Sequence, residues 1–292
     1  MSRTTTVSTK ALPALTTLLL FLQSALVVTG GTVRLTGSGL GCPTWPECTP
    51  GSYTPVPHQA EGQLHAWIEF GNRLLTFALF FAAIATLIAV FRSHRRDLRF
   101  LALTQILGIL AQGVLGGITV LTNLNPLSVA SHYLLSIFLI AAATSLQSRR
   151  HHPQVRTAAS HVEISRFSTA HLYLTFLVIV VGTLVTGSGP HAGDIDAPRL
   201  SLNIQHVAYL HGGLVILLII LTGFFYRQKR QRQETRRSLN VFSLLTLAQG
   251  LIGYIQYMQG VPELLVASHL LGSVLVWIAA WRVRLSIVRK PA

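Results

Sequence analysis

The sequence EGQLHAWIEFGNRLLT at residues 61–76 opens an apolar run that continues to Phe91. A run of this length is typical of a membrane-spanning helix, and residues 61–76 would form its outer end. At about 3.6 residues per turn, one helix face carries four polar side chains with an arginine beside them: His65, Glu69, Asn72 and Thr76, with Arg73. Charged groups at the mouth of a membrane helix are costly unless paired or used, so this face is a candidate functional site. The structural alternative is a Glu69–Arg73 pair that only orients the helix.

The composition is that of an integral membrane protein. The 292 residues are 50% hydrophobic and only 11% charged, and the mean hydropathy is +0.52. Eight apolar stretches each approach the ~20 residues that a helix needs to cross the hydrocarbon core: 11–33, 65–91, 99–121, 128–147, 167–187, 204–226, 239–258 and 265–283. The predicted fold class is therefore all-α integral membrane, with eight transmembrane helices. The first stretch is superficially like a signal peptide, but it is long and lacks an evident cleavage site, so we expect a retained span.

The net charge of +14 follows the membrane topology. With the N-terminus inside, all but three of the 23 basic residues fall in inner segments, including RSHRRDLR at 92–99 and RQKRQRQETRR at 227–237. The three exceptions are Arg34, Arg73 and Arg199. This asymmetry predicts a multi-pass protein of the plasma membrane with both termini in the cytoplasm. The basic runs would contact anionic membrane lipid, and we expect no nucleic-acid partner.

Internal repeats divide the chain into two halves. AQGVLGGITVL at 111–121 returns as AQGLIGYIQYM at 248–258, and VASHYLLS at 129–136 returns as VASHLLGS at 266–273. TGSG follows both the first and the fifth spans. We therefore predict two tandem, pseudo-symmetric four-helix bundles, residues 1–150 and 151–292, related by an axis along the membrane normal.

The duplication makes the histidines informative. His132 and His269 are equivalent, and His211 lies at a similar depth in the sixth span, where the repeat pairs it approximately with Asn72. Histidines on facing helices of a four-helix bundle can ligate one haem iron from both sides, which predicts a metal site at His211 and His269. The alternative for each is a hydrogen-bonded core residue. His206 points away from His211 and ranks second as a ligand.

Both cysteines, Cys42 and Cys48, lie in the Gly- and Pro-rich loop after the first span. This loop would face the oxidising side of the membrane, so we predict a disulfide that closes CPTWPEC. A structural staple is the favoured role, and thiol exchange during turnover is the alternative. A metal site is less favoured, since two cysteines without a partnering histidine pair do not make a closed site.

Three motifs together carry a family resemblance. GGTVRLTGSGLGC leads into CPTWPEC, IEFGNR opens the second span, and histidines head the fourth, sixth and eighth spans. Over essentially its whole length the chain resembles the heme A synthase family, as an actinobacterial-like variant with Asn in the second-helix motif. The resemblance implies roles for specific residues: Glu69 in catalysis, His132 on the iron of the substrate haem, His211 and His269 as axial ligands of a b-type haem, and Cys42 and Cys48 as the outer-loop pair.

The resemblance also implies a reaction. The enzyme would be an oxidoreductase that oxidises a methyl group of heme O to a formyl by successive hydroxylations, giving heme A for terminal oxidases, with heme b as cofactor. Water would supply the oxygen, Glu69 would act as general base, and Arg73 would hold a haem propionate. The family often has Glu-x-x-His-Arg where this chain has Glu69-Phe-Gly-Asn72-Arg73. Asn is a poor ligand for haem iron, and His65 lies two turns, ~10 Å, from Asn72.

The expected partners are heme O, a heme O synthase, membrane lipid and an electron acceptor that the sequence does not identify. Self-association into a homo-oligomer stays open. The alternative function is a b-type membrane cytochrome that passes electrons to or from quinone without modifying haem. A transporter built from repeats fits less well, because its sites lie near the midplane, whereas the polar residues here gather at outer helix ends.

Overall fold

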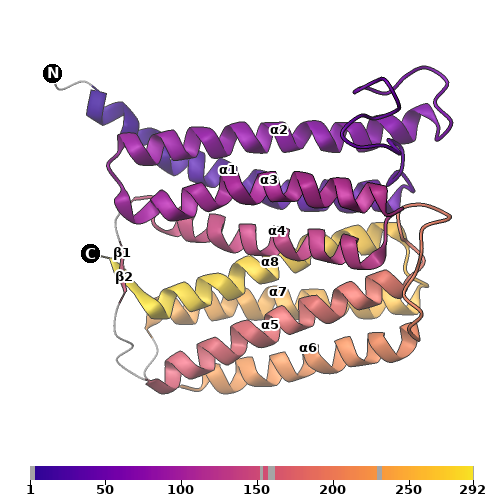
Figure 1. Ribbon diagram of the computed structural model, residues 1–292. Helices are drawn as coiled ribbons and strands as arrows, with labels where there is room; N and C mark the ends of the chain where they lie inside the picture. Colours follow the sequence, from indigo (N-terminus) through magenta and orange to yellow (C-terminus); the bar gives the residue numbers. More distant parts are fainter. Residues whose placement is uncertain (1–3, 152–153, 157–161, 229–231, 292) are drawn as a thin grey trace. The chain divides into compact units, whose positions relative to one another are not determined.

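The computed structural model describes residues 4–151, 154–156, 162–228 and 232–291 (Figure 1). The helices are α1 (Thr4–Leu35), α2 (Gln63–Arg92), α3 (Arg99–Leu121), α4 (Pro126–Ser148), α5 (Val162–Ser188), α6 (Ile204–Tyr226), α7 (Gln233–Met258) and α8 (Glu263–Val288), with a 3-10 turn η1 (Arg96–Leu98) before α3. Each of the eight is long and apolar enough to cross a membrane. The prediction of an all-α membrane protein with eight spanning helices is confirmed.

Several helices begin before the apolar stretch that predicts them. α1 begins at Thr4 rather than residue 11, and α7 begins at Gln233 rather than residue 239. An apolar run marks the hydrocarbon layer, whereas the backbone stays helical for another turn or two in the interfacial region. Two short strands, β1 (Gln154–Arg156) and β2 (Arg289–Pro291), pair antiparallel with Val155 opposite Lys290. Three-residue strands have no recognisable alternation, so the sequence does not predict them.

The helices group into two compact units. Unit 1 comprises Met1–Ala143 and Thr186–Asn203, and unit 2 comprises Thr144–Val185 and Ile204–Ala292. The loop at 186–203 thus belongs with the first unit, although it follows the fifth span. The division into repeat halves at residue 150 stays a prediction. Below, the outer end of a helix is the end that the predicted topology places outside; in unit 1 it carries the cysteine loop.

In unit 1, α2 packs along α1 and against α3. Only a minority of each span is buried within the protein, so most apolar side chains face outward, as expected for a surface that lipid covers. The buried interior also holds a polar pair. The Gln23 amide donates to the side-chain oxygen of Gln105 (2.9 Å), and the Gln105 amide donates to the carbonyl of Leu139 (3.0 Å).

In unit 2, α8 packs along α7, and α6 packs against α7. The core near the inner end joins Leu218 and Phe225 of α6, Leu239 and Phe242 of α7, and Val276, Ala279, Ala280 and Val283 of α8. Alanines on α8 allow the α7 and α8 backbones to approach closely, as small residues do in membrane helix pairs.

The Gln23–Gln105 pair generates a stability prediction. Gln23→Leu leaves the buried oxygen of Gln105 without its donor, so we expect a loss of about 1–3 kcal/mol in the free energy of unfolding. Gln23→Leu/Gln105→Leu removes both partners and should lose less than the sum of the two single variants. Thermal unfolding in detergent measures the three variants; strictly additive losses would contradict a coupled pair.

Candidate functional site

The carboxylate of Glu69 is buried at the outer end of α2, with 6% of the residue exposed. The Cys42 backbone N–H donates to its Oε2 (2.7 Å), and Arg73 donates to its Oε1 from Nε (3.1 Å) and Nη2 (2.7 Å). Glu69 and Arg73 are four residues apart and so lie one above the other on α2. The predicted polar face of α2 therefore includes Glu69 and Arg73 as an ion pair, and the cysteine loop packs against this pair.

Arg73 binds the cysteine loop as well as Glu69. Its guanidinium donates to the carbonyls of Cys42 (2.9 Å), Thr44 (3.1 Å) and Glu47 (3.2 Å). These contacts occupy the fork of donors that would otherwise be available to a propionate. In this structure the guanidinium therefore anchors the loop backbone to α2.

The predicted disulfide between Cys42 and Cys48 is present, and both residues are fully buried. The side-chain amide of Gln59 donates to the carbonyl of Gly41 and so ties the far part of the loop to the disulfide. Trp45, in the middle of CPTWPEC, lies directly against Gly117 of α3, where a Cβ would meet the indole ring. The disulfide loop therefore lies over the outer ends of α2 and α3.

Each even-numbered helix places one polar side chain against a glycine of a neighbouring helix. A Cβ added to the glycine would lie 3.1–3.2 Å from the imidazole in the three histidine pairs, which is a tight contact, and 3.7 Å from the Asn72 amide, which is an ordinary one. The four pairs are Asn72 with Gly30, His132 with Gly116, His211 with Gly182, and His269 with Gly253. His132 and His269 lie six residues into their helices and His211 seven, as the predicted similar depth requires.

The three histidines present the same ring edge to their glycines. In each, Nδ1 is buried and makes no hydrogen bond of standard geometry. The backbone of Leu115 lies close to the imidazole of His132, and the backbone of Val178 lies close to that of His211. The imidazoles of His211 and His269 have centroids 6.4 Å apart and planes inclined at 67°. Imidazole–metal bonds of about 2 Å, plus roughly 1 Å from nitrogen to ring centre on each side, require about 6 Å. The centroid separation is therefore compatible with one metal ion between the two rings.

In unit 1 the residue at the position of a second ligand is Asn72. Thr29 donates to its side-chain oxygen (2.8 Å), which fixes the amide against α1. His65 lies closer than Asn72 to the first residue of α2, and its Nδ1 is hydrogen-bonded to the hydroxyl of Ser38 (2.8 Å). His132 is held by its backbone, because Gln112 donates to the His132 carbonyl (3.1 Å) and to Ser136 (2.6 Å). Among the four polar residues that pack against glycines, unit 1 therefore has one imidazole, His132, and one amide, Asn72.

A comparison with protein-family models supplies the broader context. Residues 13–193 match the model of COX15-CtaA, described as cytochrome oxidase assembly protein. That match covers well over half of the chain. The chain belongs to this family.

Individual relatives agree with the family match. A heme A synthase from Geobacillus kaustophilus is 33% identical over 109 residues, which is 37% of this chain and 32% of the relative. Heme A synthases from Exiguobacterium sp. and Bacillus pumilus are 28% and 27% identical over 77% of this chain, and the alignments cover 76% and 77% of those proteins. The chain thus matches about a third of the length of the Geobacillus protein and about three quarters of the length of the Exiguobacterium and Bacillus proteins.

Two features of this family member were not predicted from the sequence. Gln112, whose amide donates to the His132 carbonyl, lies inside the repeated phrase AQG, which was read only as evidence of the internal repeat. Arg34 donates to the carbonyl of Thr186 (2.7 Å), and its Nε is buried without a partner. Arg199 lies near it and donates to the carbonyls of Ala197 and Pro190. The sequence feature that could have identified Arg34 and Arg199 is their location. Together with Arg73, they are the three basic residues that the predicted topology does not assign to inner segments.

Other histidines have different surroundings. His206 is exposed near the start of α6. His171 is fully buried at the inner end of unit 2, where its ring lies 4.2 Å from that of Phe242 and 5.9 Å from that of Phe225. Within the described residues, no group of three or more His, Cys, Asp or Glu could hold a metal ion. A bis-histidine haem site needs only two protein ligands and is compatible with that finding.

The Arg73 contacts predict that the guanidinium shape, and not only its charge, holds the cysteine loop. Arg73→Lys keeps the charge but cannot reach Glu69 and three carbonyls together. We expect the Cys42–Cys48 disulfide to be reduced several-fold faster by an impermeant reductant, followed by thiol labelling. Arg95→Lys is the control, since Arg95 pairs with Asp97 in the exposed η1 loop. Equal reduction rates in the two variants would contradict the anchoring role.

Proposed function

We propose that the protein is a heme A synthase, a membrane oxidoreductase that converts the methyl group of heme O into the formyl group of heme A. The family match, and relatives that carry the name heme A synthase, support this reading. The observation that carries it is the His211–His269 pair, whose 6.4 Å ring separation suits a b-type haem. That haem supplies one-electron transfer when bound.

The substrate site is proposed in unit 1, around His132. The His132 imidazole would bind the iron of heme O from one side, and Gln112 would hold the helix turn that carries it. Asn72 presents an amide rather than an imidazole, so we propose that the substrate haem has one protein ligand. A single ligand is reasonable for a molecule that must leave after conversion, since each axial bond slows release.

Glu69 is the proposed general base. A carboxylate has about four acceptor positions. Arg73 fills two on Oε1, and the Cys42 N–H fills one on Oε2. One position on Oε2 remains, where a water molecule can donate and lose its proton. The same hydrogen bonds fix the carboxylate's orientation.

The reaction requires electron removal. Each hydroxylation with water adds oxygen to the methyl carbon and releases two electrons and two protons; after the second, the hydrated aldehyde loses water to give the formyl. Glu69 would take protons from the attacking water and pass them to the outer aqueous side. Four electrons in all must pass to an acceptor outside the chain, and the b-type haem that His211 and His269 would hold would supply one-electron transfer.

Arg34 and Arg199 are the proposed partners of the substrate's propionates. The buried, unpartnered Nε of Arg34 is a donor without an acceptor. Neither arginine forms an ion pair among the residues that the structure describes. A guanidinium pairs well with a carboxylate, and two of them at the outer end would orient the propionates toward water.

The remaining proposals follow from the topology and the reaction. We place the protein in the plasma membrane with both termini in the cytoplasm, and we propose delivery of heme O by a heme O synthase. The comparisons do not favour the alternative of a cytochrome that only passes electrons. The two differ in extracted pigment: co-expression with a heme O source should give heme A, whereas a simple cytochrome would give heme B alone.

Glu69→Gln should separate catalysis from haem binding. The amide cannot act as a base, so we expect heme A formation to fall by roughly 100-fold or more, with heme O or a hydroxylated intermediate accumulating. Chromatography of acid-acetone extracts measures this, and absorbance measures the b-type haem, which should persist. Glu47→Gln is the control: Glu47 lies in the same loop, and its side chain accepts a hydrogen bond from the Gly51 N–H.

The competing structural role makes a different prediction. If Glu69 serves only as the partner of Arg73, removing its charge lowers the yield, but the protein that folds still converts heme O. Breaking such a buried pair typically costs ~3–5 kcal/mol. Wild-type heme A production per mole of folded Glu69→Gln protein would end the catalytic assignment.

The haem assignment has its own test. His211→Ala and His269→Ala should each abolish the low-spin b-haem absorbance, since each removes one axial ligand. His206→Ala is the control and should keep it. In unit 1, Asn72→His should add a second low-spin signal if residue 72 faces the substrate iron. Retention of the b-haem spectrum in both unit 2 variants would place the cofactor elsewhere.

A further inference from the structure

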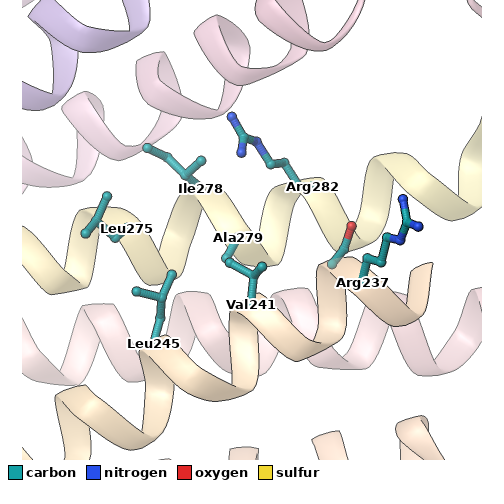
Figure 2. A pocket seen from close by; sticks show the side chains of 8 residues that line it. Arg237, Val241, Leu245, Leu275, Ile278, Ala279 and Arg282 are labelled. Atoms are coloured by element: carbon teal, nitrogen blue, oxygen red, sulfur yellow. The ribbon is translucent and has the colours of Figure 1, made fainter. Parts of the chain in front are cut away.

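A narrow apolar groove runs between α7 and α8 in unit 2 (Figure 2). It encloses about 330 Å³. Its walls are Val241 and Leu245 of α7 and Leu275, Ile278 and Ala279 of α8. Ala279 is buried at the bottom and Val241 is half exposed at the rim, so the groove opens outward from the helix pair.

Two arginines stand at one end of this groove. Arg237 and Arg282 both line it, one from the first turns of α7 and the other from the last turns of α8, with Ser238 beside them. Arg282 donates from one guanidinium nitrogen to the side-chain oxygen of Gln147 (3.1 Å), which leaves its other donors available. Arg150 is close enough to Arg282 for mutual repulsion.

The positive charge at this end has no acidic partner among the residues that the structure describes. Among the described residues, neither Arg237 nor Arg282 forms an ion pair. Glu234, one turn before Arg237, is exposed and makes no ion pair with it. Closely spaced guanidinium groups without a carboxylate are stabilised by an anion.

We propose that this groove binds one anionic phospholipid, with its phosphate at Arg237 and Arg282 and an acyl chain along the apolar wall. Charge and shape favour this occupant together: a free phosphate would leave the apolar wall unused, and a neutral lipid would leave the arginines unpaired. The predicted topology places this end of α7 and α8 at the inner leaflet, where anionic lipids and basic pockets between helices meet. The site lies at the opposite helix end from His269 and does not depend on the proposed reaction.

The test uses the full-length protein purified in a neutral detergent, with phosphatidylglycerol and phosphatidylcholine as probes. Native mass spectrometry should show one phosphatidylglycerol retained in preference to phosphatidylcholine. At roughly a factor of five per arginine near the membrane surface, Arg237→Gln/Arg282→Gln should weaken retention about thirty-fold. Glycerol phosphate, which has the headgroup charge without chains, should not displace the lipid.

Matched variants separate this site from general surface charge. Arg236→Gln removes the same charge one residue away, where the guanidinium lies over the ring of Tyr226, and should retain the lipid. Val241→Phe fills the groove from its half-exposed rim and should reduce retention, whereas Leu244→Phe, on an outward-facing position of α7, should not.

Three results would overturn the proposal. One is equal loss of lipid in Arg236→Gln and in the double variant, which would indicate diffuse charge. Another is equal retention of phosphatidylcholine and phosphatidylglycerol, and the third is unchanged binding in Val241→Phe. Far-UV circular dichroism and thermal unfolding in detergent, recorded on every variant, verify that the fold is intact before lipid retention is compared.

Discussion

Inside a hydrocarbon layer the backbone has no hydrogen-bond partner except itself, and this constraint organises the whole protein. Long helices satisfy their own N–H and C=O groups, so α1 to α8 cross the layer and irregular backbone is confined to their ends. Polar side chains that must stay within a span are then paired there, as Gln23 is with Gln105. Chemistry that needs charge, water or an unpaired imidazole is consequently placed near helix ends.

The outer end of α2 shows how such charge is made tolerable. An isolated carboxylate at this depth would be strongly disfavoured. Glu69 instead accepts from Arg73 and from the Cys42 N–H, while Arg73 binds three loop carbonyls. The ion pair and the disulfide loop therefore stabilise each other: the loop supplies the hydrogen bonds that the charges need, and the charges fix the loop. A structural role for the pair and a catalytic role for Glu69 are compatible, because one acceptor position on the carboxylate remains.

The glycine contacts explain how single imidazoles keep a defined direction. In His132, His211 and His269 the Cε1–Nδ1 edge lies against a glycine of a neighbouring helix, and this close packing restricts how the ring can be oriented. The two units use this arrangement differently. Unit 2 has two such rings facing each other, whereas unit 1 has one ring and an amide, Asn72, bonded to Thr29.

Sequence alone determined the spans, the repeat and the residue types at the outer ends, because hydrophobic runs and periodicity act locally along a helix. It also placed Glu69 beside Arg73 and gave the equivalence of His132 with His269, since both depend only on residue spacing. Only the tertiary structure decided what those groups contact. That Arg73 binds loop carbonyls, that Gln112 holds His132, that Trp45 lies on Gly117 and that Arg34 meets the 186–203 loop all join segments far apart in the chain. No periodic pattern in the sequence encodes such pairings. They depend on how several helices pack together and on the requirement that each buried donor has an acceptor.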